Sequence, residues 1–220
     1  MDHAEKIDNS PKIIDCADEI VALSMADGYA RVTGCPQAVL VHFDAGVLSL
    51  GAALHRARTG RVPVLVFATL PASTQEGEYR GSRYHSSHWL TDIPEQKAIV
   101  SQHCRYSAEV KTGRNIKQMV YRALSLATSE PAGPVYLQAS TEVLEEVIEP
   151  YQIQEKFWGP MQLGGLTEDQ LRIVTRTLSS AQEPLVVTGY SGRHPDVAPL
   201  LEQLANKIPA LHASRLITHE

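Results

Sequence analysis

The sequence predicts an α/β protein with a mostly parallel sheet whose helices cover both faces. Short apolar runs of strand length alternate with helical patterns along the first two-thirds of the chain, which is the order typical of this class. Several of these runs are apolar at every position, as in strands buried on both faces of a parallel sheet. A change of composition then divides the chain, so we expect a first domain over 1–145, a linker over 146–164 and a partial second α/β domain over 165–220.

The first half of the chain divides into alternating strands and helices. Helices are indicated by apolar residues three or four positions apart, and strands by continuous apolar runs between turn residues. The polar stretch 69–95, rich in Gly, Ser, Arg and His, predicts a long loop, and such loops in compact domains are usually functional. The expected elements are a strand over 11–16, a helix over 18–32, a strand over 38–43, a helix over 46–58 and a strand over 62–68.

The second half continues the alternation after an irregular segment. An apolar helical face runs from Ile116 to Ala127, and a strand over 135–139 follows. Residues 142–160 are acidic and then aromatic without a period, which indicates a linker. Thr167 and Gln170 have the spacing of a capping box that opens a helix. The second domain is then expected to contain a helix over 167–178, a strand over 184–189, a helix over 197–205 and the start of a strand at 208.

Composition and charge exclude several classes of protein. Lys and Arg number 20 against 25 Asp and Glu, a net charge of −5, which argues against binding to nucleic acid or an anionic membrane by general electrostatics. The apolar runs are far shorter than the roughly 20 residues of a membrane span, and the acidic start has no signal-peptide pattern. Cys16, Cys35 and Cys104 fit neither a disulfide framework nor a zinc motif. We therefore expect a cytoplasmic protein with reduced thiols.

Two neighbouring carboxylates and the segment that follows them are the first residues to indicate a function. Asp18 and Glu19 open the first helix after a predicted strand, at the sheet edge where α/β proteins bind ligands; position alone favours plain stabilisation of the helix N-terminus. The segment Ala26-Asp27-Gly28-Tyr29-Ala30-Arg31-Val32-Thr33-Gly34 follows. Together these residues resemble the N-terminal, pyrimidine-binding domain of thiamine-diphosphate enzymes, most closely the acetolactate synthase-like group, over about 11–142, with 166–219 resembling the start of the family's middle domain.

The resemblance implies a role for Glu19. In the family this glutamate hydrogen-bonds N1′ of the aminopyrimidine ring of thiamine diphosphate. Burial in a mostly apolar pocket raises the pKa of such a carboxyl group, so that it can share a proton with the ring. The cofactor then acts as the electron sink for decarboxylation or carboligation of a 2-oxo acid, the substrate class that the resemblance implies.

Two residues after the second strand are further cofactor-binding candidates. Asp44 and Gly46 fall where the family has a Gly-rich turn near the cofactor, although the Ser-Gly-Pro-Gly type of loop is absent. A simple tight turn explains Gly46 as well as a place in the site does. Asp44 is equally explained as the N-cap of the following helix.

The 69–95 loop supplies the substrate candidates. Gln75, Arg80, Arg83 and His85 fall where relatives place residues beside cofactor and substrate, and the two arginines are suited to a substrate carboxylate. A solvated loop arginine is the plain alternative for each. His85 and His88 have metal-ligand spacing but no completing ligand, so no metal site is expected.

The resemblance also shows what the chain lacks. Family members hold the diphosphate through Mg²⁺ with a Gly-Asp-Gly segment in a third domain, and the 220 residues contain no Gly-Asp-Gly. The strand and helix that begin the family's domain are also missing before Pro11. We therefore expect an inactive fragment that binds the cofactor weakly and acts, if it does, as a homodimer or beside a full-length paralogue.

Other interpretations stay open at this point. A 2-oxo acid decarboxylase or 2-hydroxyacyl-CoA lyase lineage is possible within the family, and some members bind FAD in the middle domain. Outside it, the chain is interpretable as a non-catalytic remnant that regulates a paralogue. A third alternative is an unrelated α/β module that binds a nucleotide at Gly46 or Gly189, although a plain turn explains Gly189 better.

Overall fold

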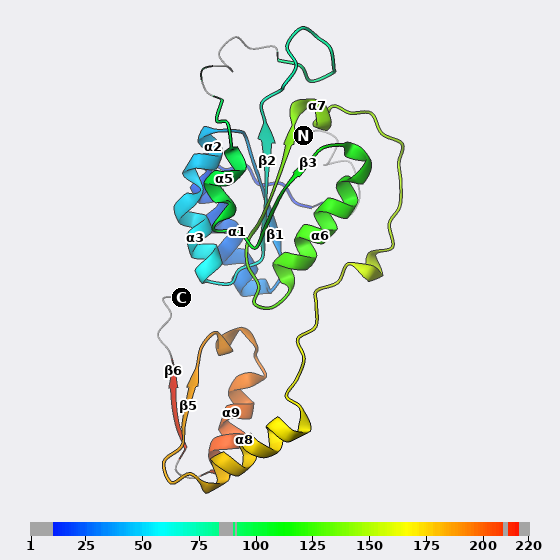
Figure 1. The fold of residues 1–220 in the computed structure, drawn as a ribbon. Helices are drawn as coiled ribbons and strands as arrows, with labels where there is room; N and C mark the ends of the chain where they lie inside the picture. Colours follow the sequence, from blue (N-terminus) through cyan, green and yellow to red (C-terminus); the bar gives the residue numbers. More distant parts are fainter. Residues whose placement is uncertain (1–10, 84–89, 91, 209–210, 216–220) are drawn as a thin grey trace. The chain divides into compact units, whose positions relative to one another are not determined.

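The computed structural model describes residues 11–83, 90, 92–208 and 211–215. The chain forms two compact units, Met1–Met161 and Gln162–Glu220, which are drawn in Figure 1. The division falls inside the segment 146–164 that was expected to be a linker.

The first unit is built on a sheet of four parallel strands in the order β1-β2-β4-β3. Parallel strands need crossover connections, and most of the helices lie in these connections. The elements described in this unit are α1 (Glu19–Thr33), β1 (Gln37–Val41), α2 (Ala45–Ser49), α3 (Gly51–Thr59), β2 (Val64–Leu70), α5 (Gln96–Ser101), β3 (Tyr106–Val110), α6 (Ile116–Thr128), β4 (Val135–Ser140) and α7 (Thr141–Leu144), with 3₁₀ turns over Gly113–Asn115 and Glu155–Phe157.

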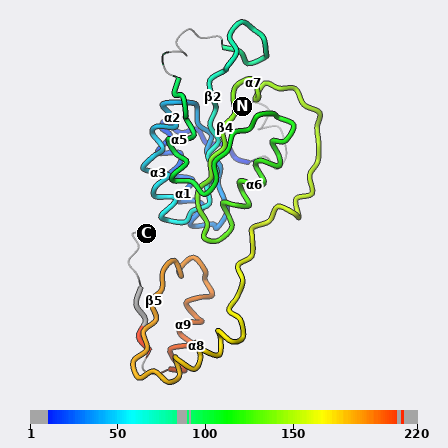
Figure 2. The backbone as a smooth tube through the Cα atoms, viewed as in Figure 1, coloured from blue at the N-terminus to red at the C-terminus, as the bar shows by residue number. Residues whose placement is uncertain are grey.

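Helices cover both faces of this sheet, as Figures 1 and 2 show with α6 on one side and α1, α2, α3 and α5 on the other. Alternate residues of β2 and β4 supply the two cores. Val64, Val66 and Tyr136 pack into the core shared with α1, α3 and α5, whereas Leu65 and Leu137 pack against α6. Because these strands are buried on both faces, their sequences are continuous apolar runs. The predicted α/β class is confirmed.

Some predicted elements were wrong in detail. Residues 11–16 form no strand, because no neighbouring strand pairs with them and Ile13 and Ile14 are exposed. β1 is an edge strand, so its Leu40 side chain is 75% exposed instead of buried. The helix expected over 46–58 is divided at Leu50 into α2 and α3.

The segment after α7 lies along the first unit. The Lys117 N–H donates to Tyr151 Oη at 2.9 Å, and Ser125 Oγ donates to the Gly159 carbonyl at 2.8 Å. Both donors are on α6, so residues up to Met161 belong with this helix rather than with a free linker.

The second unit has a parallel pair of strands and two helices. Its elements are α8 (Glu168–Ser180), β5 (Leu185–Thr188), a 3₁₀ turn over Ser191–Arg193, α9 (Val197–Lys207) and β6 (His212–Arg215). The capping box predicted for Thr167 and Gln170 is formed in both directions. Among residues 162–208, Pro184 alone is buried, so this unit has almost no core of its own.

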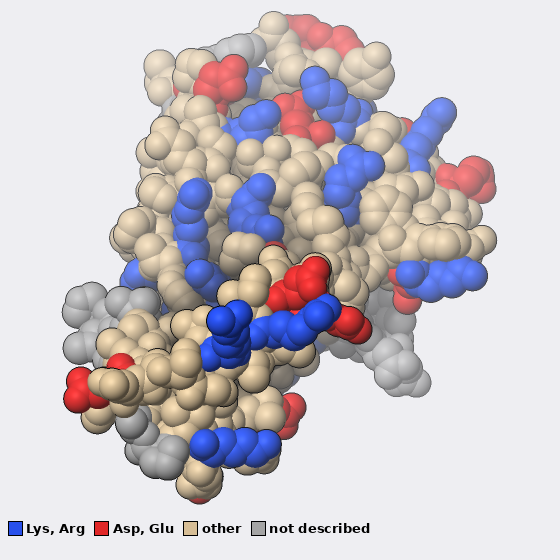
Figure 3. All heavy atoms as spheres, turned by 60° about the horizontal axis from the view of Figure 1, so that its bottom comes forward, with Lys and Arg blue, Asp and Glu red and all other residues tan. Residues whose placement is uncertain are grey.

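The surface agrees with the mixed charge of the chain. On the face seen in Figure 3, positive and negative side chains lie among larger uncharged areas. Across the described ranges, no helix combines the length and the apolar character that a bilayer crossing requires.

Candidate functional site

Glu19 lies at the carboxyl edge of the sheet, at the first turn of α1. Asp18 caps the helix, and its Oδ1 accepts a hydrogen bond from the Ile20 N–H at 2.7 Å. The Glu19 carboxyl group lies against Gly46, which follows the carboxyl end of β1: a Cβ atom at Gly46 would be 3.0 Å from Glu19 Oε1. Ser49 Oγ donates its hydrogen bond to the Gly46 carbonyl at 2.9 Å and lies 3.4 Å from Glu19 Oε2, so it is a neighbour of the carboxyl group.

This geometry brings together two of the predicted site residues, Glu19 and Gly46. A side chain at position 46 would press on the carboxyl oxygen and push the Glu19 side chain from this position. Glu19 is half-buried in this chain, rather than enclosed in the apolar pocket that the resemblance implied. An accessible carboxyl oxygen against bare backbone fits the binding of a flat heteroaromatic ring, so the residues present suit the expected cofactor.

Asp44 occupies the turn between β1 and α2 in an unusual conformation. It stands at the N-cap position of α2, but within the described structure its side chain forms no capping bond. Its φ of 50° and ψ of −100° are rare for a residue with a side chain. The plain helix-cap explanation of Asp44 therefore has no hydrogen bond to support it.

The Asp44 carboxyl group is buried, with only 5% of the residue exposed. Oδ1 accepts a hydrogen bond from the Ile93 N–H at 3.3 Å, and Oδ2 has no hydrogen-bond partner in the described structure. Burial raises the pKa of Asp44; the Ile93 N–H opposes this change and the Asp92 carboxylate adds to it.

A buried polar network holds the turn in place. Gln96, at the start of α5, accepts a hydrogen bond from the Asp44 N–H at 2.7 Å. Its Nε2 donates to the Thr69 carbonyl at 3.0 Å and to Tyr136 Oη at 2.9 Å, and Tyr136 Oη donates to Gln138 Oε1 at 3.2 Å. Gln96 therefore ties the turn after β1 to the end of β2, and to a tyrosine side chain that comes from the start of β4.

The segment after β2 is held by a carboxylate from α7. Glu142 Oε1 accepts hydrogen bonds from the backbone N–H groups of Ser73 and Thr74 at 2.7 and 2.9 Å, and from both hydroxyls at 3.0 and 2.9 Å. Burial alone would raise the pKa of Glu142, but the hydrogen bonds, led by that of the Thr74 N–H, outweigh it and lower the pKa to about 2. Glu142 is thus a structural anion that anchors this segment.

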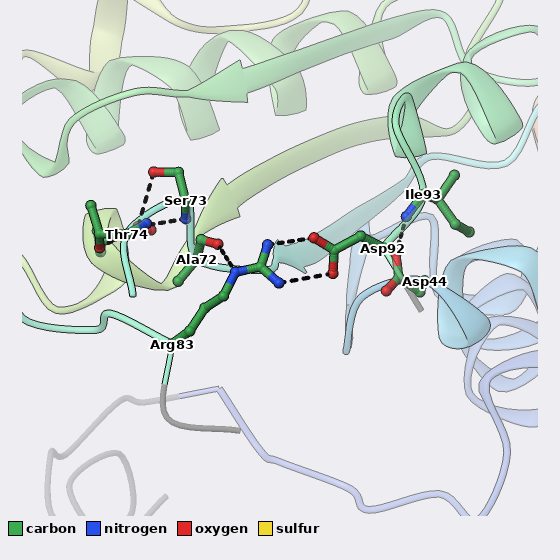
Figure 4. A network of polar contacts seen from close by, with 8 residues as sticks. Asp44, Ala72, Ser73, Thr74, Arg83, Asp92 and Ile93 are labelled. Atoms are coloured by element: carbon green, nitrogen blue, oxygen red, sulfur yellow. Dashed lines mark hydrogen bonds and ion pairs between the residues drawn. The ribbon is translucent and has the colours of Figure 1, made fainter. Parts of the chain in front are cut away.

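Arg83 is a structural residue in this chain. It forms a bidentate ion pair with Asp92, and its Nε donates to the Ala72 carbonyl at 2.5 Å (Figure 4). Only 7% of its side chain is exposed, so the solvated alternative is wrong for this arginine. A substrate carboxylate would have to compete with Asp92 for the same guanidinium group.

The other loop candidates are less constrained. Gln75 is exposed, and its N–H donates to Glu78 Oε2 at 3.0 Å. Arg80 is 72% exposed with Nη2 3.6 Å from Glu145 Oε2. His85 and His88 lie outside the described residues. Among the residues that are described, no group of three or more His, Cys, Asp or Glu side chains is placed to hold a metal ion.

Sequence reasoning missed three residues at this edge. Glu142 and Gln96 had no local motif, because their partners lie 68 or 69 and 52 positions away. His42 had a local signal, since it directly follows β1; its Nδ1 is 3.1 Å from Thr69 Oγ1 at the end of β2.

Residues 1–99 match the family described as thiamine pyrophosphate enzyme, N-terminal TPP binding domain; thiamine pyrophosphate is another name for thiamine diphosphate. Residues 1–99 are thus an N-terminal, TPP-binding domain of acetolactate synthase-like type. The predicted resemblance is confirmed.

Individual relatives extend the similarity along the chain. Acetolactate synthase of Bacillus subtilis (strain 168) is 26% identical over 201 residues, covering 91% of this chain and 33% of that protein. 2-Hydroxyacyl-CoA lyase 2 of Danio rerio is 29% identical over 149 residues, 68% of this chain and 22% of the lyase. The chain thus spans about a third or less of these two relatives.

A solved structure shares the fold of both parts of the chain. The thiamine diphosphate-dependent 4-hydroxybenzoylformate decarboxylase of Rhodococcus jostii RHA1 superposes with a TM-score of 0.66 at 22% identity, covering 90% of this chain and 36% of the decarboxylase.

Proposed function

We propose that Glu19 binds the aminopyrimidine ring of thiamine diphosphate at N1′. We also propose that the protein to which this domain belongs cleaves or forms a carbon–carbon bond next to the carbonyl of a 2-oxo acid. The observation that supports this most directly is the position of the Glu19 carboxyl group beside Gly46, where a Cβ atom would be 3.0 Å from Oε1. The acetolactate synthase-like domain supplies the class of cofactor.

Each residue of this site has a separate task. Glu19 holds or takes the proton at N1′ of the ring, Gly46 leaves room for the carboxyl group, and Ser49 lies beside its second oxygen. Gln96 holds the strand ends in register. When bound, the cofactor supplies the electron sink for the reacting carbonyl.

The finer function is proposed by analogy with relatives. Acetolactate synthase-like carboligation is our first choice, and the decarboxylase and 2-hydroxyacyl-CoA lyase lineages are the alternatives within the same chemistry. We further propose that Mg²⁺ is held by a Gly-Asp-Gly segment supplied from outside these 220 residues, and that FAD is optional. The protein would act in the cytoplasm, as a homodimer or paired with a full-length paralogue. The chain alone should bind the cofactor weakly and show no turnover, because the diphosphate then lacks its metal ion.

The proposal is tested by titrating thiamine diphosphate into the chain and into Glu19→Gln by calorimetry. Glutamine keeps the shape but loses the charge-assisted hydrogen bond, so we expect affinity to fall roughly tenfold or more. The matched control is Glu145→Gln, an exposed carboxylate on another segment, which should leave the affinity unchanged. Equal affinity of the parent chain and Glu19→Gln would overturn the proposed role. Capture of a full-length paralogue without cofactor binding would favour a regulatory partner instead.

A further inference from the structure

Asp44 combines two features that folding alone does not explain. Its backbone has a positive φ of 50°, which costs about 1 kcal/mol or more for a residue with a side chain. Its buried Oδ2 has no hydrogen-bond partner in the described structure, and buried polar atoms of this kind are rare. Gln96 nevertheless holds the Asp44 backbone in place through a 2.7 Å hydrogen bond. A strained, unpartnered carboxyl group that is actively held in position indicates a functional role.

Among the described residues, no cationic side chain forms an ion pair with Asp44. Arg83 lies nearby, but its guanidinium group is already bound bidentately to Asp92 (Figure 4). His42 and Arg83 exert only through-space attraction, and Asp92 repels. Within the described structure, the hydrogen bond that the Asp44 side chain accepts comes from the neutral Ile93 N–H. Buried carboxylates are ordinarily paired with a cation or fully hydrogen-bonded, so a cationic group is the missing partner.

We propose that Asp44 is a ligand-binding carboxylate that pairs with the positively charged ring of thiamine diphosphate. The inference rests on the proposed function and deepens it. Asp44 lies two residues before Gly46, the backbone against which Glu19 rests, so both carboxyl groups approach the same sheet edge. Glu19 recognises the pyrimidine ring, and Asp44 recognises the charge of the thiazolium ring.

This pairing has a physical consequence that distinguishes it from a packing role. A cation beside Oδ2 favours the ionised carboxyl group and counteracts the effect of burial. The pKa of Asp44 should therefore fall when a cationic ligand binds. Replacement of the thiazolium by an uncharged thiophene ring removes the charge while keeping the shape, so this neutral analogue should leave the pKa of Asp44 near its unbound value.

The test compares two ligands and two variants of the full chain. Asp44→Asn is nearly isosteric, and asparagine accepts positive φ; Asp169→Asn changes the net charge equally at an exposed position of the second unit. Thiamine diphosphate and its neutral thiophene analogue are titrated by calorimetry. We expect Asp44→Asn to lower the affinity for thiamine diphosphate roughly tenfold and to change the affinity for the neutral analogue little. Asp169→Asn should change neither affinity.

The outcomes separate this inference from the proposed function. Suppose that Glu19→Gln lowers the affinity for both ligands. If Asp44→Asn then lowers both affinities equally, or changes neither, the pairing of Asp44 with the cationic ring is wrong. If the parent chain binds neither ligand, or Glu19→Gln has no effect, the proposed function itself fails. Should Asp44→Asn not fold, a carboxyl-carbon NMR titration of the parent chain replaces it: a pKa of Asp44 that does not fall with thiamine diphosphate overturns the inference.

Discussion

At the scale of single residues, the clearest stabilising carboxylate is Glu142. Because its pKa is lowered from 4.5 to about 2 in the folded chain, ionised Glu142 stabilises the fold fully above about pH 4.5. This contribution is lost as pH falls from about 4.5 through about 2. Glu142→Gln keeps the volume but loses the charge-assisted hydrogen bonds to Ser73 and Thr74. We expect the free energy of unfolding in urea at pH 7 to fall by about 1 to 2 kcal/mol.

Glu145→Gln is the matched residue-scale control. Glu145 is more than half exposed, and its oxygen is 3.6 Å from Arg80, so its loss should change stability little. The difference in the free energy of unfolding between the parent chain and Glu142→Gln should become steadily smaller as the urea titration is repeated at lower pH. A difference that is the same at pH 7 and pH 3 would contradict the role of the charge.

At the scale of elements, the segment after β2 is held against α7 by a close backbone approach. Gly81 has a φ of +80°, and a Cβ atom there would be 2.5 Å from the Thr141 carbonyl oxygen. Gly77 has a φ of +86° but open space around it. Gly81→Ala and Gly77→Ala should therefore each lose about 1 kcal/mol or more of stability because alanine disfavours positive φ. Only Gly81→Ala also places a Cβ atom against the Thr141 carbonyl oxygen. Thermal unfolding should show the larger loss of stability for Gly81→Ala; equal losses would contradict the close approach.

The helices and strands differ in how strongly the local sequence indicates them. α1 was predictable because its end carries a local signal, Gly34 in the left-handed conformation. β3 is not a continuous apolar run: Ser107 and Glu109 alternate with less polar residues, as in a half-buried edge strand, and the five residues are too short for this alternation to stand out. Within the site, Glu19 followed from a motif, whereas the hydrogen bond of Gln96 joins residues 52 positions apart and leaves no local pattern.

At the scale of the whole chain, burial is distributed very unevenly between the two units. The first unit contains every buried hydrophobic residue that the described structure has, among them Val64, Val66 and Leu137 at 0% exposure. In the second unit, Leu171, Ile173 and Leu185 are each more than half exposed. Since protection of backbone amides follows local stability, amides of β2 and β4 should exchange slowly.

The final prediction concerns the amides of α8 and β5 in the second unit. With so little apolar area buried, this unit should open far more often than the first, and mass-spectrometric hydrogen exchange of the diluted chain should label α8 and β5 within seconds. Raising the protein concentration tests the proposed homodimer, because a second copy that covers Leu171 and Ile173 would slow their exchange. Slow exchange of α8 at every concentration would contradict the prediction, since it would require a core that the described side chains do not form.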